Sequence, residues 1–178
     1  MRLPKSLLLL TALLPGVARA QSTEEIKPPF SLTWGETSAR LERLLEGAKA
    51  KIVERRQVEG GREAWDVDGI TQPGLKRTIF FFRGGELVEV ELQYQKAEWD
   101  QAKYDEYMGQ MRRSIEARYG QGQLIARKTE PIGEVMQTVV GYKWNQNNTT
   151  LELFFFSAQN PKKADEVFRT LSVHYRGH

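Results

Sequence analysis

Two histidines, His174 and His178, are the residues best suited to supply a general base or a metal ligand near neutral pH. His174 lies in the segment 171–176, where apolar residues alternate with polar ones, and this period predicts a half-buried strand. The polar positions of such a strand point away from its buried face, and His178 is the terminal residue. Because neither histidine has a partner in the surrounding sequence, we expect no catalytic residue and no metal site.

Other chemistries find little support in the residue types and their spacing. In the segment 89–92 glutamates alternate with apolar residues, which is typical of a half-buried strand with solvent-facing acids. The segment 66–69, Asp-x-Asp-Gly, resembles the start of a calcium loop, but the later ligands and the closing glutamate are missing. The absence of cysteine excludes thiolate nucleophiles and thiolate metal ligands. We therefore expect a protein without a cofactor that is not an enzyme.

The first twenty residues have the three parts of a secretory signal peptide. Arg2 and Lys5 precede an apolar run over 7–14, and a small-residue cleavage site follows at 18–20. A membrane-spanning helix needs about 20 apolar residues, and this run is shorter and is interrupted by a Pro-Gly pair. We predict that 1–20 is a signal peptide cleaved after Ala20, with a periplasmic or extracellular mature protein and no membrane span.

The net charge indicates which partners are excluded. The chain has 26 basic and 23 acidic residues, which gives a net charge of +3. Three of the basic residues, Arg2, Lys5 and Arg19, lie in the leader, which has no acid. The remaining chain is therefore balanced at 23 of each sign, without the overall positive field that attracts a polyanion. We expect no nucleic-acid partner.

Hydrophobic spacing predicts two helices among several strands. Thr37 can cap a helix whose apolar positions Leu41, Leu44 and Leu45 share a face and which ends at Gly47. A longer helix is predicted over 98–119, with Gly120 as its stop. Strands are predicted over 52–58, 63–67, 77–83, 86–94, 124–128, 135–144, 149–157 and 171–176, and a short helical segment over 162–168.

The order of helix and strands occurs twice, and aromatic landmarks accompany it. Trp65 and Trp144 are 79 residues apart, and the triple phenylalanines at 80–82 and 154–156 are 74 apart. We predict an α+β fold with one curved antiparallel sheet, two or three helices on one face and two tandem helix-plus-strands repeats. A lead-in segment over 21–33 precedes the first repeat, 34–97, and the second repeat, 98–178, within one compact domain.

The turn before the first predicted helix resembles a known repeat. Gly35-Glu36-Thr37, followed by Leu41, is similar to the Gly-x-Ser/Thr start of the repeat in the β-lactamase-inhibitor-protein-like fold, and the SmpA/OmlA envelope lipoproteins are similar there. The resemblance implies an exported, non-catalytic, protein-binding role. The chain lacks the lipid-anchoring cysteine of those lipoproteins and the disulfide cysteines of the inhibitors, so anchoring and partner are left open.

Aromatic residues of the predicted sheet are candidates for a binding surface. A two-residue turn at Gly84-Gly85 places 81, 88, 90 and 92 on one face, which suits packing against the helices. The other face would carry large apolar side chains that could bind a protein. This candidate surface consists of Phe80, Phe82, Leu87, Phe154 and Phe156. In a second interpretation the lead-in segment or a loop covers these side chains.

Two functions from different classes remain. The first is an exported protein-interaction module, inhibitor-like or envelope-assembly-like, whose partner is another exported or envelope protein. The alternative is a periplasmic or extracellular carrier that holds an apolar small molecule or lipid between sheet and helix. Its lining would be Trp99, Tyr104, Met108 and Met111.

Overall fold

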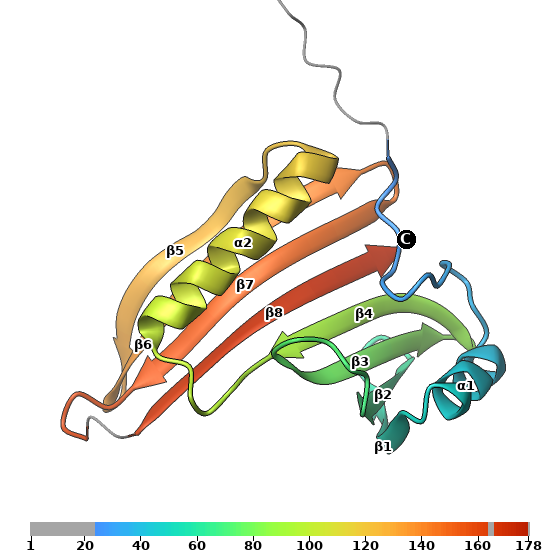
Figure 1. The fold of residues 1–178 in the computed structure, drawn as a ribbon, viewed down its shortest axis with the longest axis horizontal. Helices are drawn as coiled ribbons and strands as arrows, with labels where there is room; N and C mark the ends of the chain where they lie inside the picture. Colours follow the sequence, from blue (N-terminus) through green and yellow to red (C-terminus); the bar gives the residue numbers. More distant parts are fainter. Residues whose placement is uncertain (1–23, 164–165, 178) are drawn as a thin grey trace, which may run out of the picture.

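The computed structural model describes residues 24–163 and 166–177, so the predicted signal peptide and the start of the lead-in lie outside the described residues. The described chain is α+β, as predicted, with a single antiparallel sheet (Figure 1). Its elements are α1 (Ser38–Gly47), β1 (Lys51–Val58), β2 (Arg62–Asp68), β3 (Leu75–Arg83), β4 (Glu86–Tyr94), α2 (Gln101–Tyr119), β5 (Gln123–Ile132), β6 (Val135–Gln146), β7 (Thr149–Gln159) and β8 (Val167–Gly177).

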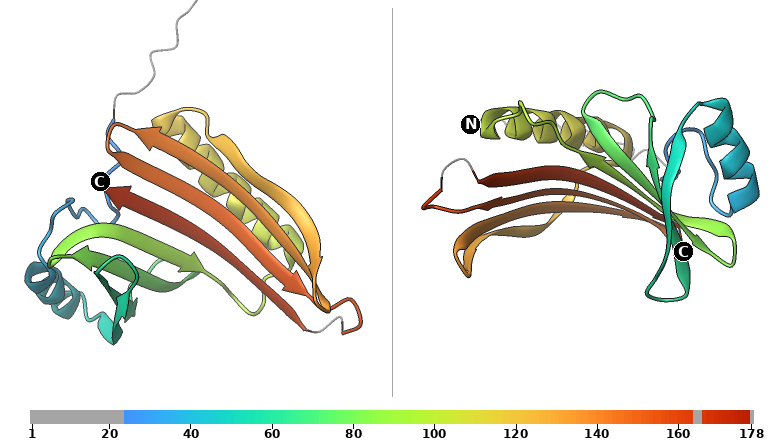
Figure 2. Two further views of the ribbon diagram at one scale, coloured as in Figure 1. Left: turned by 180° about the vertical axis from the view of Figure 1, so that it is seen from behind. Right: turned by 90° about the horizontal axis from the view of Figure 1, so that it is seen from below.

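The eight strands follow the order β1-β2-β3-β4-β8-β7-β6-β5. Each half of the chain is a meander of four strands, and the fourth strands of the two halves pair in the middle of the sheet. The sheet is open, with β1 at one edge and β5 at the other. Figure 2 shows that the sheet twists, so that the first four strands are turned steeply relative to β5–β8. This right-handed twist is the ordinary consequence of strand geometry.

The two helices begin where the sequence supplies a cap. Thr37 Oγ1 accepts a hydrogen bond from the Arg40 amide at the start of α1, and Asp100 Oδ1 accepts one from the Lys103 amide at the start of α2. The second helix therefore begins three residues later than predicted. The predicted helical segment at 162–168 is wrong: Asn160 and Lys163 close a turn, and Val167 already begins β8.

The main hydrophobic core contains side chains of both helices and of the strands. α1 contributes Leu41 and Leu45 and α2 contributes Tyr104 and Ile115, whereas Leu44, predicted to share the buried face of α1, is 47% exposed. α2 packs along β7 and β8, and α1 packs beside β1 (Figure 1). The alternating positions of the strands supply the rest of this core, which includes Trp65, Phe80, Phe82, Leu87, Val90, Trp144, Leu153 and Phe155.

The prediction that Phe80, Phe82 and Leu87 face away from the helices is wrong. All three are about 1% exposed and belong to the main core. The cause is a β-bulge between Phe81 and Phe82: Phe82 pairs with Leu87, but Phe81 pairs with Glu89, which leaves Val88 as the extra residue. The bulge shifts the alternation of β4, so that Leu87 and Val90 point to the same face. Phe80 and Phe82 therefore share a face with Val90, the residue that the sequence pattern had placed against the helices.

The lead-in segment covers part of this core, as in the second interpretation of the aromatic residues. The rings of Phe30 and Phe80 lie 6.4 Å apart, and Ile26 is fully buried. The indole nitrogen of Trp34 donates a hydrogen bond to the carbonyl of Ile26 and so ties the segment to the start of the first half. Within the described residues, neither helix has the length and apolar character needed to cross a membrane.

Candidate functional site

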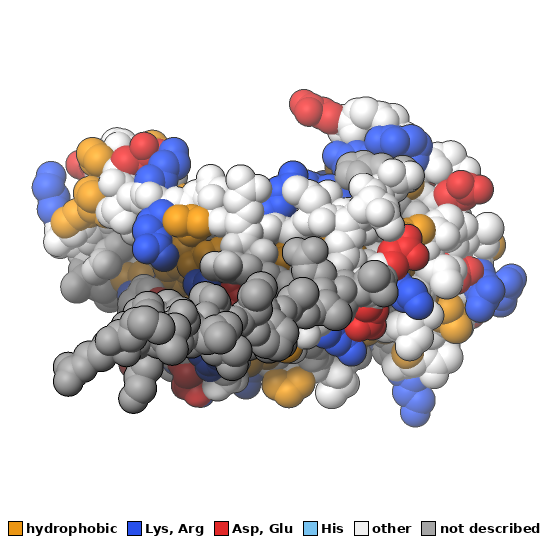
Figure 3. All heavy atoms as spheres, turned by 90° about the horizontal axis from the view of Figure 1, so that it is seen from above, with side chains coloured by type: hydrophobic (Ala, Val, Ile, Leu, Met, Phe, Trp, Pro, Cys, Tyr) orange, Lys and Arg blue, Asp and Glu red, His pale blue; other side chains and the backbone are white. Residues whose placement is uncertain are grey.

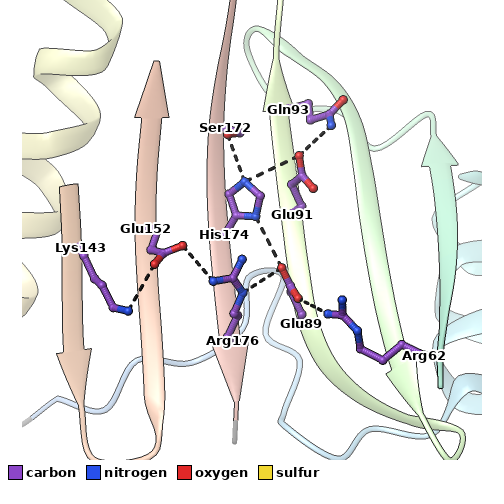
Figure 4. A network of polar contacts seen from close by, with 9 residues as sticks. All are labelled: Arg62, Glu89, Glu91, Gln93, Lys143, Glu152, Ser172, His174 and Arg176. Carbon is purple, nitrogen blue, oxygen red and sulfur yellow. Dashed lines mark hydrogen bonds and ion pairs between the residues drawn. The ribbon is translucent and has the colours of Figure 1, made fainter. Parts of the chain in front are cut away.

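The face of the sheet opposite the main core, the open face, carries a network of charged and polar side chains. The network crosses the middle of the sheet through β2, β4, β8, β7 and β6 (Figure 4). Its members stand at alternating positions of each strand, which is why they share one face. They are Arg62, Glu89, Glu91, Gln93, Lys143, Glu152, Ser172, His174 and Arg176.

Glu89 is the centre of this network. Arg62 Nη1 lies 2.7 Å from its Oε2, and Arg176 Nε lies 3.1 Å from its Oε1. Its side chain is buried, and burial alone would raise its pKa. The neighbouring imidazole of His174 and the charge of Arg176 outweigh burial, so that the pKa of Glu89 is lowered from its ordinary value of 4.5. The carboxylate is therefore ionised at neutral pH and holds both guanidinium groups in place.

Arg176 extends the network across the second half of the sheet. Its Nη1 donates to Glu152 Oε2 at 2.9 Å, and Lys143 Nζ lies 3.4 Å from the other oxygen of Glu152. Figure 4 shows these side chains as one chain of contacts from β6 to β2. The basic side chains of this network compensate the two buried carboxylates, Glu89 and Glu152, as burial requires.

His174 points away from the main core, as the alternation of its strand predicts, but it has partners that the sequence did not indicate. Its Nε2 lies 3.1 Å from Ser172 Oγ, and its Nδ1 lies 3.5 Å from Glu89 Oε1. Glu91 Oε1 lies 3.8 Å from Nε2. In the sequence, this cluster is indicated by a polar residue at every second position of β4 and of β8. The sequence pattern does not show that these two strands are neighbours in the sheet.

Ser172, His174 and Glu89 contact one another in the order serine, histidine, carboxylate, which is also the order of a hydrolytic triad. Whether such a cluster can act as a triad depends on the groups around the serine. A triad needs free amide or side-chain donors that stabilise an oxyanion beside the serine. Ser172 is paired with Gln93 on one side and Phe154 on the other, in a strand that is hydrogen-bonded along both edges. The serine thus lacks the exposed turn that presents a nucleophile with neighbouring amide donors. The cluster is better suited to fixing the orientation of Glu89 and Glu91.

The Asp-x-Asp-Gly segment contributes to a second, separate charge cluster. Asp66 lies within β2 and is about 3% exposed. Its two oxygens lie 3.2 Å from Arg56 Nη2 and 3.3 Å from Arg77 Nη1. The carboxylate thus holds three neighbouring strands together. In the described part of the chain, no group of three or more histidine and acidic side chains is arranged to hold a metal ion.

Phenylalanines of the second half occupy the open face beside the charged network. Phe154 meets the ring of His174 edge-on at 6.0 Å, and Phe156 lies 6.0 Å from Phe168. Phe168 is 49% exposed. We call Phe154, Phe156 and Phe168 the aromatic patch. The sequence pattern predicted Phe154 and Phe156 on this face. It did not predict Phe168 there, because Phe168 belongs to the predicted helical segment 162–168.

The four residues of the predicted carrier lining are used in packing. Tyr104 is about 1% exposed, and its hydroxyl donates to the Arg169 carbonyl at 3.1 Å. Trp99 packs edge-on against Tyr104, with ring centroids 5.3 Å apart. Met108 and Met111 are partly buried against the main core. Three cavities of about 630, 310 and 190 Å³ lie elsewhere, and none of these three is lined by these four side chains.

Gly141 gives a test of the packing under the aromatic patch. A Cβ at this position would collide with the ring of Phe154, so Gly141→Ala should lower the free energy of unfolding by about 1–3 kcal/mol. The control is Gly109→Ala in α2, where the nearest atom is the flexible end of Arg113 and a helical alanine should stabilise by up to about 1 kcal/mol. Urea unfolding measures both changes. Equal effects of the two variants would contradict the packing.

Comparison with known proteins yields no relative: no protein-family model, curated protein or solved structure matches this chain.

Proposed function

We propose that this protein is an exported, non-enzymatic interaction module that binds another exported or envelope protein through the open face of its sheet. The observation that carries the proposal is the exposed ring of Phe168 packed against Phe156, on a sheet face beside an ordered charge network. Aromatic side chains are enriched in the centres of protein interfaces, where they contribute large contact areas. The aromatic patch supplies such a centre.

The charges beside the patch suit a polar rim. The chain of contacts from Arg62 to Lys143 is fixed by neighbouring carboxylates, so these side chains lose little further freedom when a partner docks. Elsewhere on the surface, Figure 3 shows Lys and Arg side chains interspersed with Asp and Glu. Such a mixed surface favours a specific partner over a polyanion. The equal numbers of basic and acidic residues outside the predicted leader also favour a protein partner over a polyanion.

We also propose that the two halves are tandem repeats with both helices on one face of the sheet, in the manner of the inhibitor-like and SmpA/OmlA-like folds. One helix followed by four strands occurs in each half. The first strand of each half has a bulge, at Val53 in β1 and at Ile125 in β5, and both bulged side chains are exposed. The basic and apolar leader in the sequence supports export.

Site-specific photocrosslinking in the producing cell tests the proposed interface. Benzoylphenylalanine at position 168 should give one discrete adduct with an exported protein, because this ring lies in the aromatic patch. The same probe at Gln110, an exposed position of α2, should not give that adduct. The proposal is contradicted if position 168 gives no adduct or if both positions give the same one. Secretion of the mature chain, checked by its N-terminal sequence, tests the leader.

A further inference from the structure

Three of the six residues that line a small cavity on the open face are arginines. It has a volume of about 190 Å³ and lies where the end of β8 meets the β3–β4 turn. Its lining consists of Arg62, Arg83, Val88, Glu89, Arg176 and Gly177. Three guanidinium groups thus border a space that holds a single carboxylate, and this carboxylate is already shared by two of them.

Two of these arginines oppose each other directly. Arg62 of β2 is the cross-strand partner of Arg83 of β3. Like charges at directly opposite positions destabilise a sheet. Glu89 compensates Arg62, but among the described residues no carboxylate lies within 4 Å of the Arg83 guanidinium. On its other side Arg83 stands opposite Glu86 of β4, whose carboxylate also does not approach within 4 Å. The Arg83 guanidinium thus has no close counter-charge among the described residues, and a bound anion would supply one.

The guanidinium groups of Arg62 and Arg176 are held in position by these contacts and still have unused N–H donors. Arg62 uses Nη1 for Glu89 and Nε for the Glu59 carbonyl, and its guanidinium lies 5.3 Å from the ring centre of Phe81. Arg176 uses Nε and Nη1. A guanidinium has five N–H donors, so each of these two keeps an Nη2 group that is not used in these contacts. Figure 4 shows both arginines converging on Glu89 from opposite sides.

The charge of the lining points to the chemical class of the anion. Three arginines against one glutamate give the lining residues an excess of two positive charges. Guanidinium forks bind carboxylate and phosphate groups with paired hydrogen bonds, and a phosphate monoester carries about two negative charges at slightly alkaline pH. At about 30 Å³ per water molecule, the cavity has room for one phosphate group and a few further atoms.

We infer that this cavity binds one dianionic phosphate group, either as inorganic phosphate or at the end of a small monoester. The cavity does not include the aromatic patch, which is the centre of the proposed interface, although it shares Arg62, Glu89 and Arg176 with the charged rim. Arg62, Arg83 and Arg176 donate to the phosphate oxygens. Glu89 does not touch the ligand and keeps two of the arginines in place.

Calorimetric titration of the mature protein with inorganic phosphate at pH 8 tests this site. We expect saturable binding that Arg83→Gln weakens by at least about tenfold, since it removes charged hydrogen bonds to the anion. Arg83 is exposed, so the variant should fold like the wild type, which circular dichroism checks. Arg43→Gln, at an exposed position of α1, is the matched control and should leave the affinity unchanged.

Parallel titrations with glycerol phosphate and with acetate identify the ligand. Tighter binding of glycerol phosphate supports a monoester, and equal or tighter binding of inorganic phosphate supports the free anion. The inference is overturned if inorganic phosphate and glycerol phosphate both fail to saturate the protein at millimolar concentration, if Arg83→Gln binds as the wild type does, or if acetate binds as tightly as phosphate. None of these results bears on the crosslinking at position 168, so the two proposals can fail separately.

Discussion

Replacing Phe80 with alanine should lower the free energy of unfolding by about 3–5 kcal/mol. The ring is about 1% exposed and fills the space between β3, the lead-in segment and the main core, so its removal leaves a cavity. The loss combines the transfer of the ring to water with the contacts that its neighbours lose. Urea unfolding monitored by circular dichroism measures this change.

Phe168→Ala is the matched control for this prediction. Its ring is 49% exposed on the open face, so the variant should lose less than about 1 kcal/mol. The pair thus compares a phenylalanine of the main core with one that is exposed on the open face. A loss for Phe80→Ala as small as the loss expected for Phe168→Ala would show that Phe80 is not part of a closed core.

Glu89→Gln should lower the free energy of unfolding by about 2–3 kcal/mol at pH 7. The substitution keeps the shape of the side chain but removes the charge that Arg62 and Arg176 share. Hydrogen bonds to charged groups contribute about 1.5–3 kcal/mol, and a buried ion pair that loses one partner is strongly destabilised. Both arginines are partly exposed, so water compensates some of the loss. Glu46→Gln, at an exposed position of α1, should have little effect.

The same variant should remove a pH dependence. Because the pKa of Glu89 is lowered on folding, the folded carboxyl group binds its proton more weakly than the unfolded one. Its contribution to stability is therefore fully present above about pH 4.5, the ordinary value, and is lost as the pH falls through the lowered pKa. The stability difference between wild type and Glu89→Gln should shrink below pH 4.5. A difference that stays constant or grows on acidification would contradict this assignment.

The order of elements was predictable because it depends on local signals. The Gly84-Gly85 turn lies between two strands as predicted, and Gly120 ends α2 with a positive φ of 82°. The segment before β8 misled the prediction, because the residues from Lys162 to Phe168 have a helical spacing but Val167 is already paired with Gln159. Tertiary pairing here outweighs local preference.

The faces of the strands were only partly predictable. A single extra residue at Val88 reverses the alternation of β4, and no residue type marks such a bulge. Phe154 needed no such correction, because β6 and β7 pair without interruption and the alternation holds along them. An unbroken strand can thus be assigned a face from sequence, whereas a bulged one requires the register.

The candidate site was the least predictable part, since it depends on one distant pairing. Glu89 lies opposite Arg176, and Glu91 lies opposite His174, although the two strands are far apart in the chain. Local periodicity showed that each strand has a polar face. It carried no information on which strands are neighbours, and therefore none on the partners of His174.

The pairing of β4 with β8 also determines how the chain folds. Each meander can form from contacts between residues near in sequence, but the two halves join only when β8 has been formed. High contact order of this kind slows folding, and until then β4 presents an unpaired edge. Because a chain is synthesised from N- to C-terminus, that edge stays exposed until β8 has been made. Its folding rate and its need for a holding chaperone should therefore depend on the strand that arrives last.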